Sequence, residues 1–200
     1  MSIIARIAAV RAILVTVTAC SRDETPTRET AGDAMKAQDW IRQAYATGVP
    51  MGGDLRRSAS GNAPTLLIEA MKETDGANLD RLQVIKGWTK GGKTFEKIYD
   101  VALSDGRKLD AAGHAPPVGN TVDAKNATYP NDIGDAALSA VWTDPDFDPA
   151  AHAFYYVRLL QISTLRWSTY DAKTLGIEPR KDLPVSIQER AWSSPIWYTP

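Results

Sequence analysis

Three carboxylates at alternate positions form the sharpest charged cluster of this sequence. Asp144, Asp146 and Asp148 resemble the opening of a calcium-binding loop, in which oxygen ligands converge on a hard cation. The rest of such a loop is missing, because Pro149 replaces the glycine and Tyr155 stands where the closing glutamate belongs. We therefore interpret the segment as an acidic turn between two strands. Its three carboxylates remain candidates for contact with a ligand or partner.

Other residues offer little material for catalysis. His114 and His152 are the two histidines, and neither has a second histidine or a cysteine at metal-ligand spacing. No serine occupies a Gly-x-Ser-x-Gly elbow, and the glycines before Asp54 are too few for a phosphate loop. We predict no catalytic residue, no metal ligand and no cofactor in this chain, and we add Asp54 to the candidates for ligand contact.

The chain is rich in large aromatic residues, with six tryptophans and seven tyrosines. An exposed set of tryptophans would form a platform for a carbohydrate or a partner, whereas a buried set would supply the core of a small β-fold. The tryptophans concerned are Trp88, Trp142, Trp167, Trp192 and Trp197. We favour packing for most of them and keep the platform as the alternative.

Composition limits the classes of protein that fit. Two hundred residues correspond to one domain, with or without an appendage. With 23 Lys and Arg against 24 Asp and Glu, the net charge of -1 argues against a nucleic-acid binder. A single cysteine excludes an internal disulfide, and no apolar run approaches the roughly 18 residues of a membrane-spanning helix.

The first residues are typical of an export signal. Arg6 and Arg11 precede a short apolar stretch over residues 12–19, which ends at the only cysteine, Cys20. This ending resembles a bacterial lipoprotein box, so we predict a signal peptide over residues 1–19, lipidation of Cys20 and a flexible tether over residues 20–31. The mature chain would then be held in the cell envelope, on the periplasmic side, by acyl chains. The alternative is that Cys20 is an ordinary buried thiol.

The segment after the tether is predicted to be helical. Apolar residues recur at helical spacing between Thr30 and Thr47, and Gly48 stands where a C-cap glycine belongs. The segment up to residue 63 is polar and lacks periodicity, so residues 32–63 are interpreted as a helix and a linker.

From residue 64 the apolar pattern changes to period two, which is typical of strands. Thr89 to Lys93 contain paired glycines and predict the turn of a β-hairpin. Strands are expected at 66–71, 82–88, 95–103, 138–142, 154–162 and 191–198. Residues 64–200 are thus predicted to form a mainly β, antiparallel sandwich-like module.

Several sequence blocks also resemble a known bacterial family. They are YATGVPMGGDL (45–55), NLDRLQVIKGW (78–88), VGNTVD (118–123), VWTDPDFDP (141–149) and SPIWYTP (194–200). Together they resemble the carboxy-terminal part of the DUF3604 family, over about residues 39–200. The resemblance implies a relation to longer proteins that are similar to metal-dependent phosphoesterases of the PHP type. Their metal site lies in an amino-terminal barrel-like region, which would end within residues 32–63, and a β-rich accessory module follows it.

The metal-binding motifs of that family have no matching positions here, so a divalent metal is expected only in full-length members. We expect a non-catalytic accessory module, derived by natural truncation, a gene fragment or a misread gene start. In an alternative hypothesis, the chain completes a separately encoded metal-dependent hydrolase through Asp54 or the acidic turn. A weaker alternative is an envelope lipoprotein that binds a carbohydrate or a partner with its aromatic residues. No nucleic-acid partner is expected.

Overall fold

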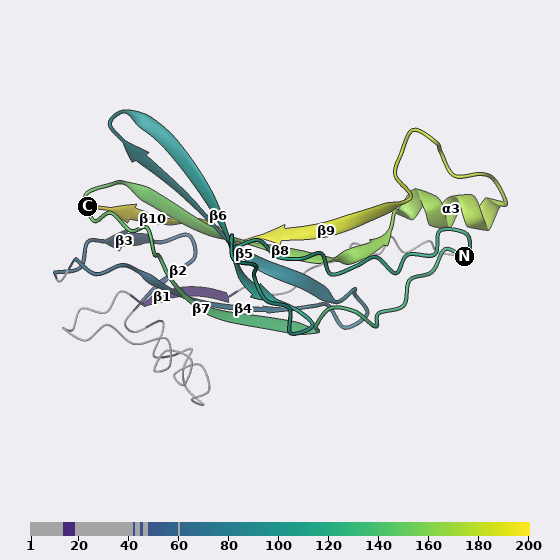
Figure 1. Cartoon of the computed structure of the whole chain (residues 1–200), viewed down its shortest axis with the longest axis horizontal. Coiled ribbons are helices and arrows are strands. Elements are labelled where there is room, and N and C mark those ends of the chain that lie inside the picture. The colour runs from purple at the N-terminus through teal and green to yellow at the C-terminus, as the bar shows by residue number, and fades with distance from the viewer. Residues whose placement is uncertain (1–13, 19–41, 43–44, 46–47, 60) are drawn as a thin grey trace.

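The fold is known from a computed structural model, which describes residues 14–18, 42, 45, 48–59 and 61–200 (Figure 1). These residues form two β-sheets and one complete helix. The larger sheet has the order β3-β10-β8-β5-β6, and β9 also pairs with β8. Its strands are β3 (Asp54–Arg56), β5 (Leu79–Lys90), β6 (Lys93–Leu103), β8 (Ala153–Leu165), β9 (Ser186–Trp192) and β10 (Ile196–Thr199).

The smaller sheet has the order β2-β1-β4-β7. Its strands are β1 (Leu14–Thr18), β2 (Val49–Pro50), β4 (Thr65–Met71) and β7 (Ala137–Thr143). Apolar side chains of β4 and β7 meet those of β3, β5, β8 and β10 in one core. The core includes Leu55, Leu66, Ile68, Ala70, Leu82, Val84, Leu138, Ala140, Tyr155, Val157, Leu159, Ile196 and Tyr198. The mainly β fold predicted from the period-two pattern is confirmed.

The predicted hairpin is present and connects the two long strands β5 and β6. Lys90 pairs with Lys93, and the two glycines between them have φ of 58° and 74°. Positive φ at both central residues is the requirement of a type I′ turn, which glycine meets without steric cost. In Figure 1 the free end of this hairpin rises away from β8 and β10.

The predicted strand over residues 191–198 is wrong in one respect, because two strands occupy this region. β9 and β10 both pair with β8, on either side of residues 193–195. The backbone N–H of Ser193 still donates to the carbonyl of Val157, but the Val157 N–H donates to the Ser193 hydroxyl, at 2.9 Å, instead of to a backbone carbonyl. Pro195 has no N–H to donate to a ladder, so the strand stops and begins again.

The larger sheet is mixed rather than antiparallel throughout. β3 runs parallel to β10, with Asp54 beside Trp197, whereas every other pairing between the described strands is antiparallel. Parallel neighbours need a long crossover. Here the connection from β3 to β10 is nearly the whole β-rich region, so the pairing brings together the two ends of that region.

The helix α3 (Trp167–Leu175) was not expected from the sequence pattern. It ends at Gly176, whose φ of 66° provides the left-handed cap that glycine favours. The helix packs its Thr169 and Ala172 inward, while Trp167 is 74% exposed. Among the described residues, no helix has the length and apolar character needed to cross a membrane.

The amino-terminal predictions fall mostly outside the described residues. Cys20, the tether over residues 20–31 and most of the predicted helix lie there, although Arg42 and Tyr45 are helical. Within the predicted signal peptide, Leu14–Thr18 form β1, which pairs antiparallel with β4. β2 and β3 lie within residues 32–63, so this part of the chain contributes a strand to each sheet.

Candidate functional site

The face of the larger sheet that points away from the core carries a row of five residues, one from each of five neighbouring strands. The register of the strands aligns Asp54, Trp197, Phe154, Gly87 and Glu96. Side chains alternate between the two faces of a strand. Because Leu55, Tyr155 and Tyr198 point into the core, their neighbours in this row point outward. We call this row the aromatic row.

Gly87, beside Phe154 in the aromatic row, allows an aromatic ring to lie directly on the backbone. A Cβ atom at this position would stand 2.3 Å from Cζ of Phe154, far inside van der Waals contact. Glycine within a strand weakens it and often marks such a close approach. The Phe154 ring also contacts Trp197, at 5.4 Å between ring centroids. The result is an aromatic floor across β5, β8 and β10.

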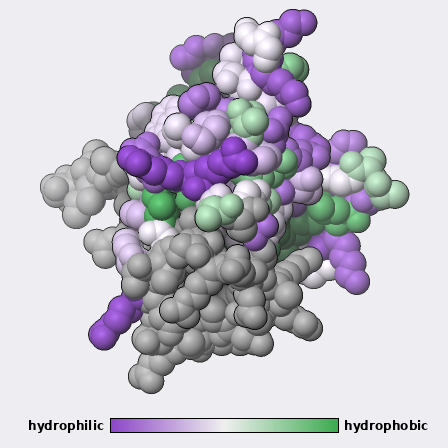
Figure 2. All heavy atoms as spheres, turned by 90° about the vertical axis from the view of Figure 1, so that its left-hand side faces the viewer, coloured by the Kyte–Doolittle hydropathy of each residue, from purple (hydrophilic) through white to green (hydrophobic). Residues whose placement is uncertain are grey.

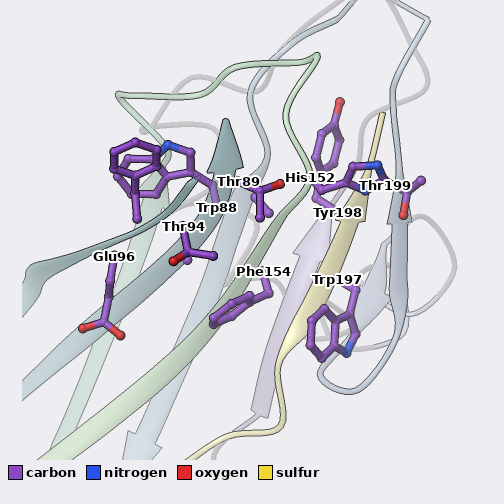
Figure 3. A pocket seen from close by; sticks show the side chains of 12 residues that line it. Trp88, Thr89, Thr94, Glu96, His152, Phe154, Trp197, Tyr198 and Thr199 are labelled. Atoms are coloured by element: carbon purple, nitrogen blue, oxygen red, sulfur yellow. The ribbon is translucent and has the colours of Figure 1, made fainter. Parts of the chain in front are cut away.

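This floor lies in a cleft of about 630 Å³ between the β5–β6 hairpin and strands β8 and β10. In Figure 3 the side chains of Phe154, Trp197 and Glu96 extend to the same side of the strands. The volume lies within the roughly 300–1,000 Å³ that is common for ligand pockets. The lining residues are Gly87, Trp88, Thr89, Thr94, Phe95, Glu96, His152, Ala153, Phe154, Trp197, Tyr198 and Thr199.

Four polar side chains of the cleft make no hydrogen bond or ion pair with the rest of the described chain. Glu96, His152, Thr89 and Thr94 are exposed, and their side chains have no hydrogen-bond or ion-pair partner within the part of the chain that the structure describes. Trp197 is 49% exposed. The cleft thus combines aromatic surface with polar groups that remain able to bind a ligand.

The outer face continues beyond the aromatic row. Tyr156, Ile85 and Ile98 form a second row, and the Phe154 and Tyr156 rings lie nearly parallel, with centroids 6.3 Å apart. A third row consists of Trp192, Arg158, Gln83 and Asp100, and hydrogen bonds through Gln83 join Arg158 to Asp100. Figure 2, which views the hairpin end of the molecule, shows apolar residues as separate areas among hydrophilic ones. Polar groups therefore border the aromatic surface.

The predicted acidic turn lies on the opposite, inward side of the larger sheet. Asp144, Asp146 and Asp148 do not converge on one point, because each contacts a different lysine. The Asp144 carboxylate is fully buried and lies 2.6 Å from Nζ of Lys86. Lys86 is the one charged residue in the apolar pattern of its strand, and its ion pair with Asp144 explains why the core tolerates it.

The buried pair also has hydrogen-bond partners. The Tyr155 hydroxyl donates to Asp144 at 2.7 Å, and Lys86 donates to the carbonyl oxygen of Asp146 at 2.7 Å. Burial, and then the Asp144 charge, raise the pKa of the Tyr155 hydroxyl well above its usual value. A tyrosine that stays protonated continues to donate to the carboxylate. The acidic turn is thereby fastened to the inner side of β5 and β8.

Asp146 and Asp148, in contrast, are bound near the surface. Lys97 and the hydroxyl of Tyr99 donate to Asp146, and these two bonds lower the pKa of its carboxyl. Lys90 contacts Asp148 at 3.1 Å, with both side chains exposed. All three carboxylates of the acidic turn are therefore engaged by the protein.

The remaining candidates from the sequence are scattered. Trp142 packs against Tyr99 and Tyr155 on the inner side, and Trp167 lies on α3. Trp88 and Trp197 line the cleft, and Trp192 lies in the third row. The five tryptophans thus do not form one platform. No motif points to Phe154 or Glu96; only the cross-strand register, with a glycine opposite an aromatic residue, would have revealed them.

No group of three or more His, Cys, Asp or Glu side chains is placed to hold a metal ion, among the residues that the structure describes. The fold and the cleft define a β-rich module with an open, aromatic-floored site. The chain matches the family described as "Protein of unknown function (DUF3604)" over residues 27–200, and it belongs to this family. No curated protein and no solved structure matches the chain.

Proposed function

We propose that this chain is a non-catalytic accessory module that binds a ligand in the cleft of its larger sheet. The observation that carries the proposal is the aromatic row, in which Asp54 and Glu96 flank the half-exposed Trp197 and the partly buried Phe154. Both carboxylates are exposed and make no hydrogen bond or ion pair within the described part of the chain, so they are free to accept hydrogen bonds from a ligand that lies on the rings.

The same residues support binding more than catalysis. The cleft holds Glu96 and a single histidine, His152, with no second acid, cysteine or serine in its lining. Hydrolysis of a phosphoester by a metal-dependent enzyme needs a bound cation to activate water and to neutralise charge. The acidic turn is a poor candidate for holding such a cation, because its carboxylates already contact lysines.

The experiment compares the full chain with a Trp197→Ala variant. In thermal-shift measurements against a broad library of sugars, peptides and metabolites, at least one compound is expected to stabilise the native chain and not the variant. Incubation of the native chain with p-nitrophenyl phosphate and Mn²⁺ should give no turnover. Chelator-sensitive turnover, or a library without any Trp197-dependent compound, would contradict the proposal.

We further propose that the module is attached to the cell envelope through Cys20. The apolar stretch that ends at this cysteine supports the assignment. Cleavage before Cys20 would remove β1, so that β4 would keep β7 on one side and become an open sheet edge on the other. Mass spectrometry of the chain from membranes of a bacterial host should detect an acylated peptide that begins at Cys20. An unmodified Cys20 joined to residue 19 would refute the assignment.

A further inference from the structure

We infer that the ligand of the cleft is an uncharged carbohydrate chain, which lies across the strands along the aromatic row. The inference rests on the proposed function, since it names the class of ligand that the same site binds. It draws on three features of the described residues: the exposed aromatic faces, the kinds of polar group beside them, and the direction and length of the row.

The aromatic faces are the first feature. A sugar ring has a face of C–H groups that packs on a flat aromatic ring, and its hydroxyl groups point outward around the edge. Trp197 offers such a surface because about half of it is exposed, while contact with the Phe154 ring limits its movement. Large, preorganised aromatic side chains supply contact area at low entropic cost. The Phe154 ring, which lies over Gly87 at an angle of 53° to the Trp197 ring, extends the aromatic surface beyond Trp197.

The polar groups beside the rings are the second feature. The carboxylate of Glu96 only accepts hydrogen bonds, whereas the hydroxyls of Thr89, Thr94 and Thr199 both donate and accept. Sugar hydroxyls likewise donate and accept, so they match this mixed set. No lysine or arginine lines the cleft. Phosphorylated and sulfated ligands need such cations, and the negative charge of Glu96 repels them.

The direction of the aromatic row is the third feature. It crosses five strands, from Asp54 on β3 to Glu96 on β6. With neighbouring strands spaced at about 4.8 Å, the row extends over roughly 19 Å. This length exceeds a single sugar ring, and carboxylates stand at both of its ends. An extended chain of several sugar units therefore fits the row better than a monosaccharide does.

The test titrates the full chain with neutral oligosaccharides: cellohexaose, xylohexaose, mannohexaose, maltohexaose and N-acetylated chitohexaose. Binding is followed by tryptophan fluorescence and calorimetry. At least one of these probes should bind, and its monosaccharide should bind at least tenfold more weakly. Trp197→Ala should weaken the binding of that probe by tenfold or more, as expected for an aromatic residue at the centre of a binding site.

Two further variants separate a specific site from general loss of structure. Glu96→Ala should weaken binding several-fold with an unchanged midpoint of thermal unfolding, because Glu96 has no partner in the described part of the chain. Trp167→Ala is the matched control: it removes an exposed tryptophan on α3, and binding should not change.

Three outcomes would overturn the inference. They are the absence of binding by all five probes, equal loss of binding in the Trp167 control, and tighter binding of a sulfated or phosphorylated oligosaccharide. If the library yields a peptide or metabolite that binds through Trp197 while the oligosaccharides fail, the carbohydrate inference is wrong and the binding module stands. If nothing binds through Trp197, both fail.

Discussion

The two faces of the larger sheet use charged groups in opposite ways. On the inner face, Lys86 and Asp144 are buried, in contact with each other and surrounded by hydrogen-bond partners. On the outer face, Asp54 and Glu96 flank an aromatic floor, and neither has a partner in the described part of the chain. The first arrangement stabilises the fold, because a buried charge without a partner is costly. The second leaves two exposed carboxylates available to the ligand that the proposed function requires. Both faces carry carboxylates, and they differ in whether the carboxylate has a partner within the protein.

The largest expected effect comes from breaking the inner pair. Asp144→Ala leaves the Lys86 ammonium and the Tyr155 hydroxyl buried without their acceptor, and should lower the free energy of unfolding by about 3–5 kcal/mol. Urea denaturation followed by circular dichroism measures this change. Asp148→Ala is the control from the same turn. Its exposed contact with Lys90 is screened by water, so the variant should be nearly as stable as the native chain.

Replacing both members of the pair tests whether the unpaired buried charge causes the loss of stability in Asp144→Ala. The double variant Lys86→Met, Asp144→Leu removes both charges and keeps apolar volume, so it should regain much of the stability lost in Asp144→Ala. A double variant that is less stable than the single one would mean that the hydrogen bonds to Tyr155 and Asp146, rather than the buried charge, dominate.

The second effect concerns the floor of the cleft. Gly87→Ala introduces a Cβ where the Phe154 ring lies and should cost about 1–3 kcal/mol through displaced packing. The same variant should reduce ligand binding, because the displaced ring no longer forms the floor. Combining it with Phe154→Ala removes the clash. The two changes should then be non-additive in stability, which a double-mutant cycle measures. Additive effects would show that Phe154 does not lie on Gly87.

The third effect is a dependence of stability on alkaline pH. The pKa of Tyr155 is raised in the folded state, so between the unfolded pKa, near 10, and the folded one, only the native state holds this proton. The contribution of this proton to the free energy of unfolding is fully present below pH 10. It is lost as pH rises, by up to about 1.4 kcal/mol per pH unit. Tyr155→Phe removes the hydrogen bond to Asp144 and should lower the free energy of unfolding by roughly 1 kcal/mol at neutral pH. The fall of this free energy at alkaline pH should be less steep in the variant. Parallel declines in the two proteins would contradict this assignment.

Much of the local structure follows from the sequence pattern. Alternation after residue 64 predicts the strands β4 to β8, and the glycine pair predicts the hairpin turn, because both depend on neighbours in the chain. The buried position of Lys86 is implied by the same alternation, although its partner is not. The mismatch of the acidic turn with a calcium loop agrees with a structural role, since each of its carboxylates contacts a lysine.

The aromatic row could not be predicted from the sequence, for a physical reason. It depends on the registers of four separate strand pairings, including the parallel one between β3 and β10, whose residues are far apart in the chain. A shift of one residue in any of these pairings would turn a side chain to the other face. The glycine turn fixes only the register of β5 with β6; the local pattern contains no information on the other three registers. The bond from the Val157 N–H to the Ser193 hydroxyl likewise exists only in the folded sheet, whereas Pro195 is a sequence signal for the break that the predicted strand over residues 191–198 did not use.

The smallest expected effect is an acid dependence at the surface of the turn. Hydrogen bonds from Lys97 and then Tyr99 lower the pKa of Asp146 in the folded state. Its contribution is therefore present above the unfolded pKa, near 3.9, and is lost as pH falls through the lower folded value. Asp146→Asn should flatten the acid end of the stability profile while changing stability at neutral pH only slightly, because the side chain is half exposed. Ligand binding should not change in this variant, since Asp146 does not line the cleft. A loss of binding comparable to that of Trp197→Ala would mean that the two faces of the sheet are coupled, and that the separation between structural and binding charges does not hold.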